Sequence, residues 1–132
     1  MKRYLVVLLV AAAMLAGARA YAHHSFAATY FEDRMVTIEG DLAQFQFRNP
    51  HSWVHVNVKE KDGTVVRYAV EWGGTGQLGN TGITRDTLKI GDHVVISGNP
   101  ARNPKQHQVR MLSLHRTKDG FGWGKKPGET FD

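Results

Sequence analysis

Two adjacent histidines, His23 and His24, stand directly after a segment with the features of an export signal. If the chain is cut after Ala22, the α-amine and the ring nitrogen of His23 can chelate one ion, because an α-amine has a pKa of about 8 and is easily deprotonated by a metal. One further imidazole would give three nitrogen ligands in a T shape. Nitrogen ligands in a tetragonal plane favour Cu(II). The sequence therefore offers a copper site at the mature amino terminus as a hypothesis. The alternative is that the residues just past the cut are disordered and bind nothing.

The third ligand is expected among the other histidines. The chain has seven histidines and no cysteine, so a metal site must use imidazole, amine or oxygen donors. His51 and His55 share one face of a predicted strand, but four residues of strand span about 13 Å, too far to bind one ion together. We expect His51, because it begins the strand beside a turn that the amino-terminal arm could reach, with His24 as the alternative. The predicted metal ligands are thus His23, His24 and His51.

The first 22 residues have the three parts of a secretory signal. Lys2 and Arg3 are positive, residues 5–15 are apolar, and small residues follow up to Ala22. The apolar run is shorter than the roughly 20 residues that span a bilayer. We therefore predict a signal peptide at residues 1–22, a periplasmic or secreted mature protein, and no stable membrane span after cleavage. The alternative is a retained membrane anchor.

Two peptide bonds fit the cleavage rule, the bond after Ala20 and the bond after Ala22. We favour the second, since Arg19 lies inside the recognition segment of the first. Cleavage after Ala20 would free Tyr21-Ala22-His23, which resembles an amino-terminal motif that holds copper or nickel in a square plane of nitrogens. Both cuts permit copper, but only the chelate that begins at His23 requires the folded domain.

The mature domain is close to neutral. The formal net charge of +5 falls to +2 when Lys2, Arg3 and Arg19 are removed with the signal. So small a positive charge gives no strong reason to bind nucleic acid, and we predict no nucleic-acid partner. Because the exported chain has no cysteine, we expect it to fold through core burial alone.

Apolar alternation predicts a single mainly β domain over residues 23–117. An extended lead-in is expected at 27–34, a mobile glycine-rich loop that could hold a helical turn around Leu78 at 73–82, and a flexible tail at 118–132. Gly40 should bend the first strand. This order predicts the five-stranded OB-fold barrel, with an unspecified β-sandwich as the alternative. The five strands are expected at residues 35–47, 51–59, 64–72, 93–98 and 107–117.

The second predicted strand also offers a ligand-binding face. Its valines are expected in the core, which leaves Trp53, His55 and Asn57 beside His51 on the outer face. Strands two and three form the usual ligand surface of OB-folds, and an outward tryptophan suits stacking on a sugar or an aromatic ring. The alternative is that the lead-in or the tail covers Trp53. This face predicts a metal-free module that binds a small molecule, an envelope component or another exported protein.

Catalysis has little support in the sequence. No Ser-His-Asp set has a suggestive spacing, and Glu71 and Asp86 stand alone as acids without a visible partner. The glycines of 73–82 do not precede a strong helix, so they do not indicate a phosphate-binding loop. We predict a binding protein and no enzyme.

Several motifs resemble those of a family of bacterial exported domains of unknown function. The resemblance covers most of residues 23–116 and implies an exported OB-like barrel, without an activity or catalytic residues. Family members often have a more helical segment where this chain has glycines at 73–82. The motifs that carry the resemblance are His23-His24-Ser25-Phe26, Asn49-Pro50-His51, Thr84-Arg85-Asp86-Thr87-Leu88-Lys89-Ile90-Gly91-Asp92 and Ile96-Ser97-Gly98-Asn99-Pro100-Ala101.

Overall fold

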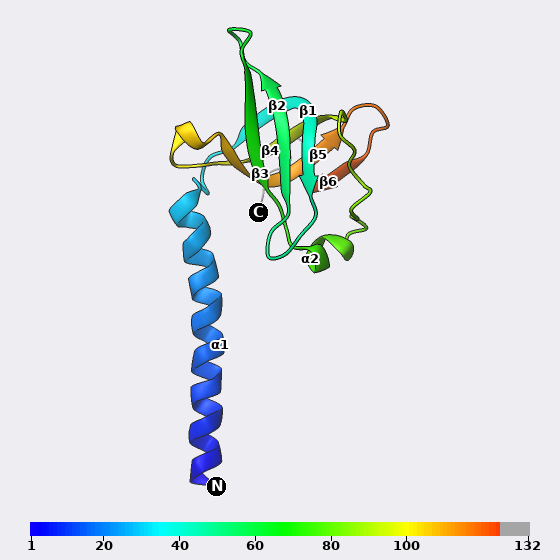
Figure 1. Ribbon diagram of the computed structural model, residues 1–132. Coiled ribbons are helices and arrows are strands. Elements are labelled where there is room, and N and C mark those ends of the chain that lie inside the picture. Colours follow the sequence, from blue (N-terminus) through cyan, green and yellow to red (C-terminus); the bar gives the residue numbers. More distant parts are fainter. Residues whose placement is uncertain (125–132) are drawn as a thin grey trace.

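Figure 1 shows the computed structural model, in which a long helix projects from a small β-barrel. The structure describes residues 1–124, apart from the side chains of residues 11, 12 and 14–25. Helix α1 spans Lys2–Thr29, the short helix α2 spans Thr75–Gly79, and a 3-10 turn, η1, spans Pro104–Gln106. The strands are β1 (Val36–Gln46), β2 (Trp53–Lys59), β3 (Val65–Glu71), β4 (His93–Pro100), β5 (Gln108–Arg116) and β6 (Gly122–Gly124).

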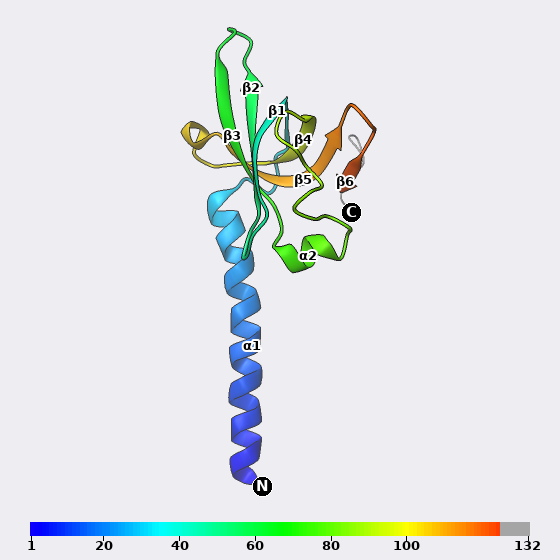
Figure 2. The same cartoon turned by 45° about the vertical axis from the view of Figure 1, so that its right-hand side comes forward.

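Strands β1 to β5 close into a barrel (Figure 2). Their order is β3-β2-β1-β4-β5, and a parallel pairing of β3 with β5 closes the ring, with Glu71 opposite Arg110. This topology is the OB-fold barrel that the sequence predicts. All five predicted strands are present, each with bounds within two residues of the expected ones.

The alternation of β2 places its valines inside the barrel, as predicted. Val54 and Val56 are fully buried and Val58 nearly so, whereas Trp53, His55 and Asn57 are half-buried on the outer face. All members of the main apolar cluster, and the side chains packed against it, lie within residues 36–123. The core of the domain is therefore built without the first 22 residues.

Gly40 permits a close approach between strands, and the bulge lies elsewhere. A Cβ at this position would lie 2.1 Å from the carbonyl oxygen of Asn57 on β2. The register between β1 and β2 shifts between Leu42 and Gln44, beyond the glycine. The expected interruption of β1 is thus present, but Gly40 supplies space for a neighbouring backbone, and the bulge follows it.

The glycine-rich segment between β3 and β4 is anchored to the core. Leu78 in α2 is completely buried, and Ile83 and Leu88 are 2% and 3% exposed. The predicted helical turn around Leu78 is confirmed, but the predicted mobile loop at 73–82 is wrong. Apolar side chains spaced along the segment hold it against the barrel despite its glycines.

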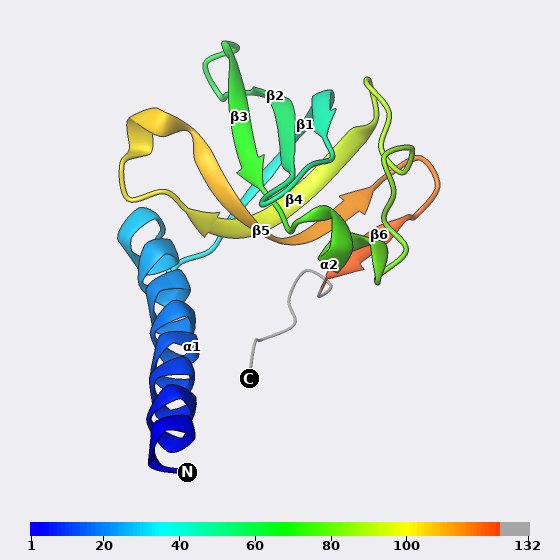
Figure 3. The ribbon, with the colours of Figure 1, turned by 60° about the horizontal axis from the view of Figure 1, so that its bottom comes forward.

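Both ends of the domain differ from expectation. Residues 27–29 continue α1, so the lead-in becomes extended only at Tyr30, which forms a bridge with Ala101. The expectation of a flexible tail from residue 118 is corrected for residues 118–124, where β6 pairs with β5 and lies beside the segment after α2 (Figure 3). Trp123 anchors this strand by packing against Trp72. Residues 125–132 lie outside the described residues.

Helix α1 continues past the predicted cleavage site, and removal of residues 1–22 stays a prediction. Its side chains from Tyr4 to Val10 are all exposed. Among the described residues, no helix is both long enough and apolar enough to cross a membrane.

Candidate functional site

A partly buried polar relay of His51, Glu71, Tyr30 and Gln108 links the start of β2 to the end of β3. His51 Nδ1 lies 3.2 Å from Glu71 Oε1. Tyr30 donates a short hydrogen bond from its hydroxyl to Glu71 Oε2, and Gln108 Nε2 donates to the Tyr30 hydroxyl over 2.6 Å. Glu71 is therefore not the isolated acid expected from the sequence. Its partners come from the lead-in and from the turn before β2, and Gln108 on β5 bonds the Tyr30 hydroxyl.

The position of Tyr30 explains its role as a donor. The side chain is 1% exposed. Burial, followed by the hydrogen bond to Glu71, raises the pKa of Tyr30 far above its ordinary value of 10.0. The phenol stays protonated at physiological pH and holds the carboxylate in place. His51 Nδ1 is the ring nitrogen that faces this carboxylate, and Nε2 has no hydrogen-bond partner among the described residues.

The amino-terminal arm reaches His51, as the sequence predicts. The Phe26 ring meets the His51 ring edge-on, with centroids 5.8 Å apart, and the Arg110 guanidinium lies 4.0 Å above the Phe26 ring. His23 and His24 belong to α1, but their side chains are outside the described ones. Among the side chains that are described, no three histidine or acidic groups gather closely enough to hold a metal ion.

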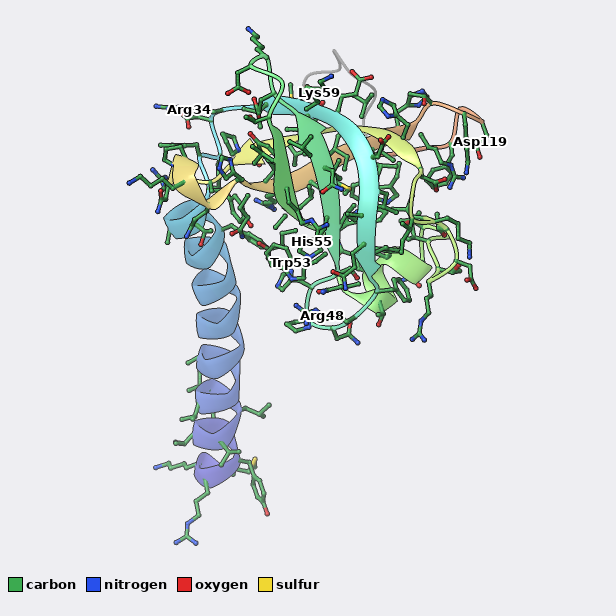
Figure 4. All side chains as sticks on the ribbon, turned by 45° about the horizontal axis from the view of Figure 1, so that its top comes forward. Arg34, Arg48, Trp53, His55, Lys59 and Asp119 are labelled. Carbon is green, nitrogen blue, oxygen red and sulfur yellow. The ribbon has the colours of Figure 1, made fainter. Side chains whose placement is uncertain are left out.

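The Trp53 face continues into this relay. Trp53 lies opposite Glu71 on β3, and Glu71 lies opposite Arg110 on β5, so the three residues form a row across the outer face of three strands. Figure 4 shows Trp53 and His55 on β2, with Arg48 at the turn that precedes it. The two predicted sites are therefore neighbouring parts of one surface.

The other members of the predicted ligand face follow β2 away from the relay. Burial, and then the charges of Arg67 and Arg48, lower the pKa of His55 below its ordinary value of 6.5, so its imidazole is neutral at pH 7. Asn57 Oδ1 accepts a hydrogen bond from Arg67 Nε over 3.2 Å. Phe26 of the arm packs against His51, and Trp123 of β6 packs against Trp72. Among the described residues, neither ring makes an aromatic contact with Trp53.

A pocket of about 370 Å³ opens beside His51. Phe26, Glu71 and Arg110 line it together with Trp72, Met111 and Trp123. Sequence reasoning missed four of the residues that build this region, namely Tyr30, Trp72, Arg110 and Trp123. The alternation of side chains along β3 and β5 could have indicated part of this region. It puts Glu71 and Arg110 on the outer faces of their strands, where a carboxylate and a guanidinium can lie close together.

Residues 10–110 match a family model described as "Family of unknown function (DUF6152)". No curated protein matches the sequence significantly. Among solved structures, the chain is similar to a small single-stranded DNA-binding protein from Streptomyces coelicolor, with 16% identity, a TM-score of 0.39, and coverage of 64% of this chain and 92% of the other.

Proposed function

This chain belongs to the family of unknown function DUF6152, and from that premise we propose that it is an exported domain that binds copper through His23 at its mature amino terminus and through His51. The proposed role is binding in the periplasm or outside the cell, without catalysis. The observation that carries the proposal is the 3.2 Å contact between His51 Nδ1 and Glu71 Oε1.

A carboxylate on one ring nitrogen prepares a histidine for metal binding. Metal-ligating histidines generally donate their second ring N–H to a carboxylate or carbonyl, which fixes the tautomer and the ring orientation. With its proton on Nδ1 toward Glu71, His51 keeps the lone pair of Nε2 for a metal. Tyr30 hydrogen-bonds Glu71 from the opposite side, so the carboxylate that orients His51 is itself held.

The arm is short enough to bring the new amino terminus to this nitrogen. Phe26 contacts the His51 ring, and His23 precedes Phe26 by three residues, a span of at most about 10 Å in an extended chain. In the uncleaved chain the nitrogen of His23 is an amide and does not chelate. Removal of residues 1–22 would therefore create the site, with His24 as the alternative third ligand.

A second candidate is a metal-free ligand face around Trp53, with His55 and Asn57. The row of Trp53, Glu71 and Arg110 favours it, because an aromatic ring stands beside an acid and a base on one surface. This chemistry fits a sugar or aromatic ring of a small molecule or envelope component, or a side chain of another exported protein. The proposed partners include no nucleic acid.

Copper titration of the protein that begins at His23 tests the first candidate. We expect one equivalent of Cu(II) to bind, and His51→Asn to weaken binding at least about tenfold. A four-glycine extension before His23 should do the same. The extension must be longer than two residues, since one or two would place a histidine third and create the square-planar amino-terminal motif. His115→Asn, an exposed histidine on β5, is the matched control.

Equal affinity in all four proteins would overturn the copper proposal. For the second candidate, Trp53→Ala should abolish binding of an envelope sugar or aromatic ligand, while His23→Ala leaves it unchanged. The reverse pattern would remove the Trp53 face as a ligand site.

A further inference from the structure

We propose that the pocket beside His51 binds a small organic anion, a carboxylate joined to an apolar body. The recognition uses Trp72 and Arg110 and does not require copper. The proposal thus goes beyond metal binding and adds a second ligand to the same end of the barrel.

Trp72 supplies an unused hydrogen-bond donor. The side chain lines the pocket and is 3% exposed. Its indole Nε1 is buried and is the one such side-chain polar atom without a hydrogen-bond partner in the described part of the chain. A buried N–H without an acceptor costs free energy, and buried polar groups are normally paired. We infer that an acceptor oxygen on a ligand reaches this atom after a small shift of the pocket wall, because Nε1 itself has almost no accessible surface.

Arg110 supplies the matching positive charge. Its guanidinium lies over the Phe26 ring and lines the same pocket. Nη1 donates to Glu32 over 3.4 Å, the one hydrogen bond that Arg110 makes from its side chain to the described residues. A guanidinium has five N–H donors in a planar fork that fits a carboxylate. The acid in the pocket wall, Glu71, is already engaged by Tyr30 and His51.

The remaining wall is apolar and fixed in position. Trp123 meets Trp72 nearly at a right angle, with ring centroids 5.0 Å apart, and Met111 is 5% exposed. Trp123 Nε1 donates to Thr81 Oγ1 over 3.1 Å, which holds β6 against the segment after α2. Ligand pockets typically combine such apolar walls with a few convergent polar groups. A volume of about 370 Å³ admits an aromatic acid with a single ring.

The experiment uses the protein from residue 23 onward, stripped of metal, because the core lies within residues 36–123. Benzoate is the probe and neutral benzamide its uncharged counterpart. Nuclear magnetic resonance follows the indole N–H signal of Trp72, and calorimetry gives the affinity. Benzoate should shift that signal in a saturable way and bind at least tenfold more tightly than benzamide.

Two variants test the donors separately. Trp72→Phe keeps most of the packing and removes the N–H, and Arg110→Gln removes the charge. Each should weaken benzoate binding at least tenfold, whereas Arg85→Gln, at an exposed position that does not line the pocket, should not. If Trp72→Phe does not fold, Arg110→Gln and the benzamide comparison decide the question.

The result that would overturn the proposal is absent benzoate binding, equal binding of benzoate and benzamide, or an unchanged affinity in Arg110→Gln. An unchanged affinity in folded Trp72→Phe would equally overturn it, because the indole N–H would then make no contact with the ligand. The four-glycine extension separates this proposal from the copper site. It should weaken copper binding at least about tenfold and leave benzoate binding intact.

Discussion

His51 and Glu71 meet at the end of the β2–β3 pair, with Nδ1 of the histidine 3.2 Å from Oε1 of the acid. The contact joins a residue before β2 to the last residue of β3. Tyr30, from the lead-in, donates to the other carboxylate oxygen. The amino-terminal arm, the second strand and the third strand thus share one polar centre beside a pocket.

Replacing the carboxylate tests whether it orients His51. Glu71→Gln keeps the size of the side chain and removes its charge. Loss of such an outer partner typically lowers metal affinity about ten- to hundredfold, and we expect a decrease of that size for Cu(II). Glu60→Gln is the matched control, because Glu60 lies beyond the far end of β2 and accepts a hydrogen bond from Tyr68 in the middle of β3. Equal affinities in the two variants would mean that Glu71 does not act on the metal site.

The proposed amino terminus has its own test. We expect the exported protein to begin at His23, because Arg19 disfavours the earlier cleavage. The intact mass of protein recovered from the periplasm or the medium distinguishes a chain that begins at His23 from one that begins at Tyr21. A mature chain beginning at Tyr21, or a chain that keeps residues 1–22, would contradict the His23 chelate.

The buried acid Asp92 should make the free energy of unfolding decrease at low pH. Asp92 is 3% exposed and accepts from Lys118, from the Lys89 N–H over 2.9 Å and from Arg116 over 3.0 Å. Burial alone would raise the pKa of Asp92, but the hydrogen bonds and charge of these partners lower it from 3.8 to about 2. The stabilisation is therefore full above pH 3.8 and is lost as the pH falls toward about 2.

Asp92→Asn should lower the free energy of unfolding by about 2 kcal/mol at neutral pH, because it removes a buried charge that bonds both Arg116 and Lys118. Urea unfolding measures the change. The control is Asp86→Asn, whose exposed carboxylate pairs with Lys89 and should contribute nothing measurable. A loss in Asp92→Asn no larger than in the control would contradict the structural role of the acid.

His93 joins β4 to β1 and should make stability fall with rising pH. Its ring nitrogens lie 3.0 Å from Glu39 Oε1 and 2.7 Å from Asp41 Oδ1. The hydrogen bond to Glu39 has the larger effect, and together the two raise the pKa of His93 above its ordinary value of 6.5. The stabilisation is full below pH 6.5 and is lost as the pH rises through the raised value.

Urea midpoints at about pH 5.5 and about pH 8.5 should differ less in His93→Gln than in the unmodified protein. Nuclear magnetic resonance titration gives the pKa of His93 directly. A His93 pKa at or below 6.5 would contradict its hydrogen bonds to Glu39 and Asp41.

Gly40 should tolerate no side chain. In Gly40→Ala the new Cβ would lie 2.1 Å from the Asn57 carbonyl oxygen, so the backbones of β1 and β2 must separate. We expect a loss of at least about 2 kcal/mol in the free energy of unfolding. Gly79→Ala, where no atom lies within 4 Å of the new Cβ, should not destabilise the fold. Similar stability in both variants would show that the strands separate without cost.

The strands of the barrel were predictable because the pattern of each lies within a short stretch of the sequence. Val54, Val56 and Val58 alternate with polar residues at the period of a strand, and each turn carries glycine or proline. The packing of the segment around Leu78 was not predictable, since its many glycines indicate a loop. The three apolar side chains that reach the core are those of Leu78, Ile83 and Leu88. Helix propensity along the chain does not report such long-range burial.

The geometry of the candidate site was predictable only in part. The sequence identifies His51 and the outward face of Trp53, and the structure brings the arm to His51 through Phe26. The sequence does not reveal that Glu71 contacts Tyr30, because the two lie 41 positions apart in the chain. It also misses Trp123, whose position depends on the pairing of β6 with β5. Contacts between distant strands follow from register, which one sequence does not specify.

Electron paramagnetic resonance of the mature protein with one equivalent of Cu(II) tests the central claim most directly. The spectrum should show hyperfine coupling to three nitrogens, from the amine, the His23 ring and the His51 ring. His51→Asn should lose one of these couplings, while His115→Asn keeps all three. A spectrum that is unchanged in His51→Asn, or that changes only in His24→Asn, would contradict copper binding through His51.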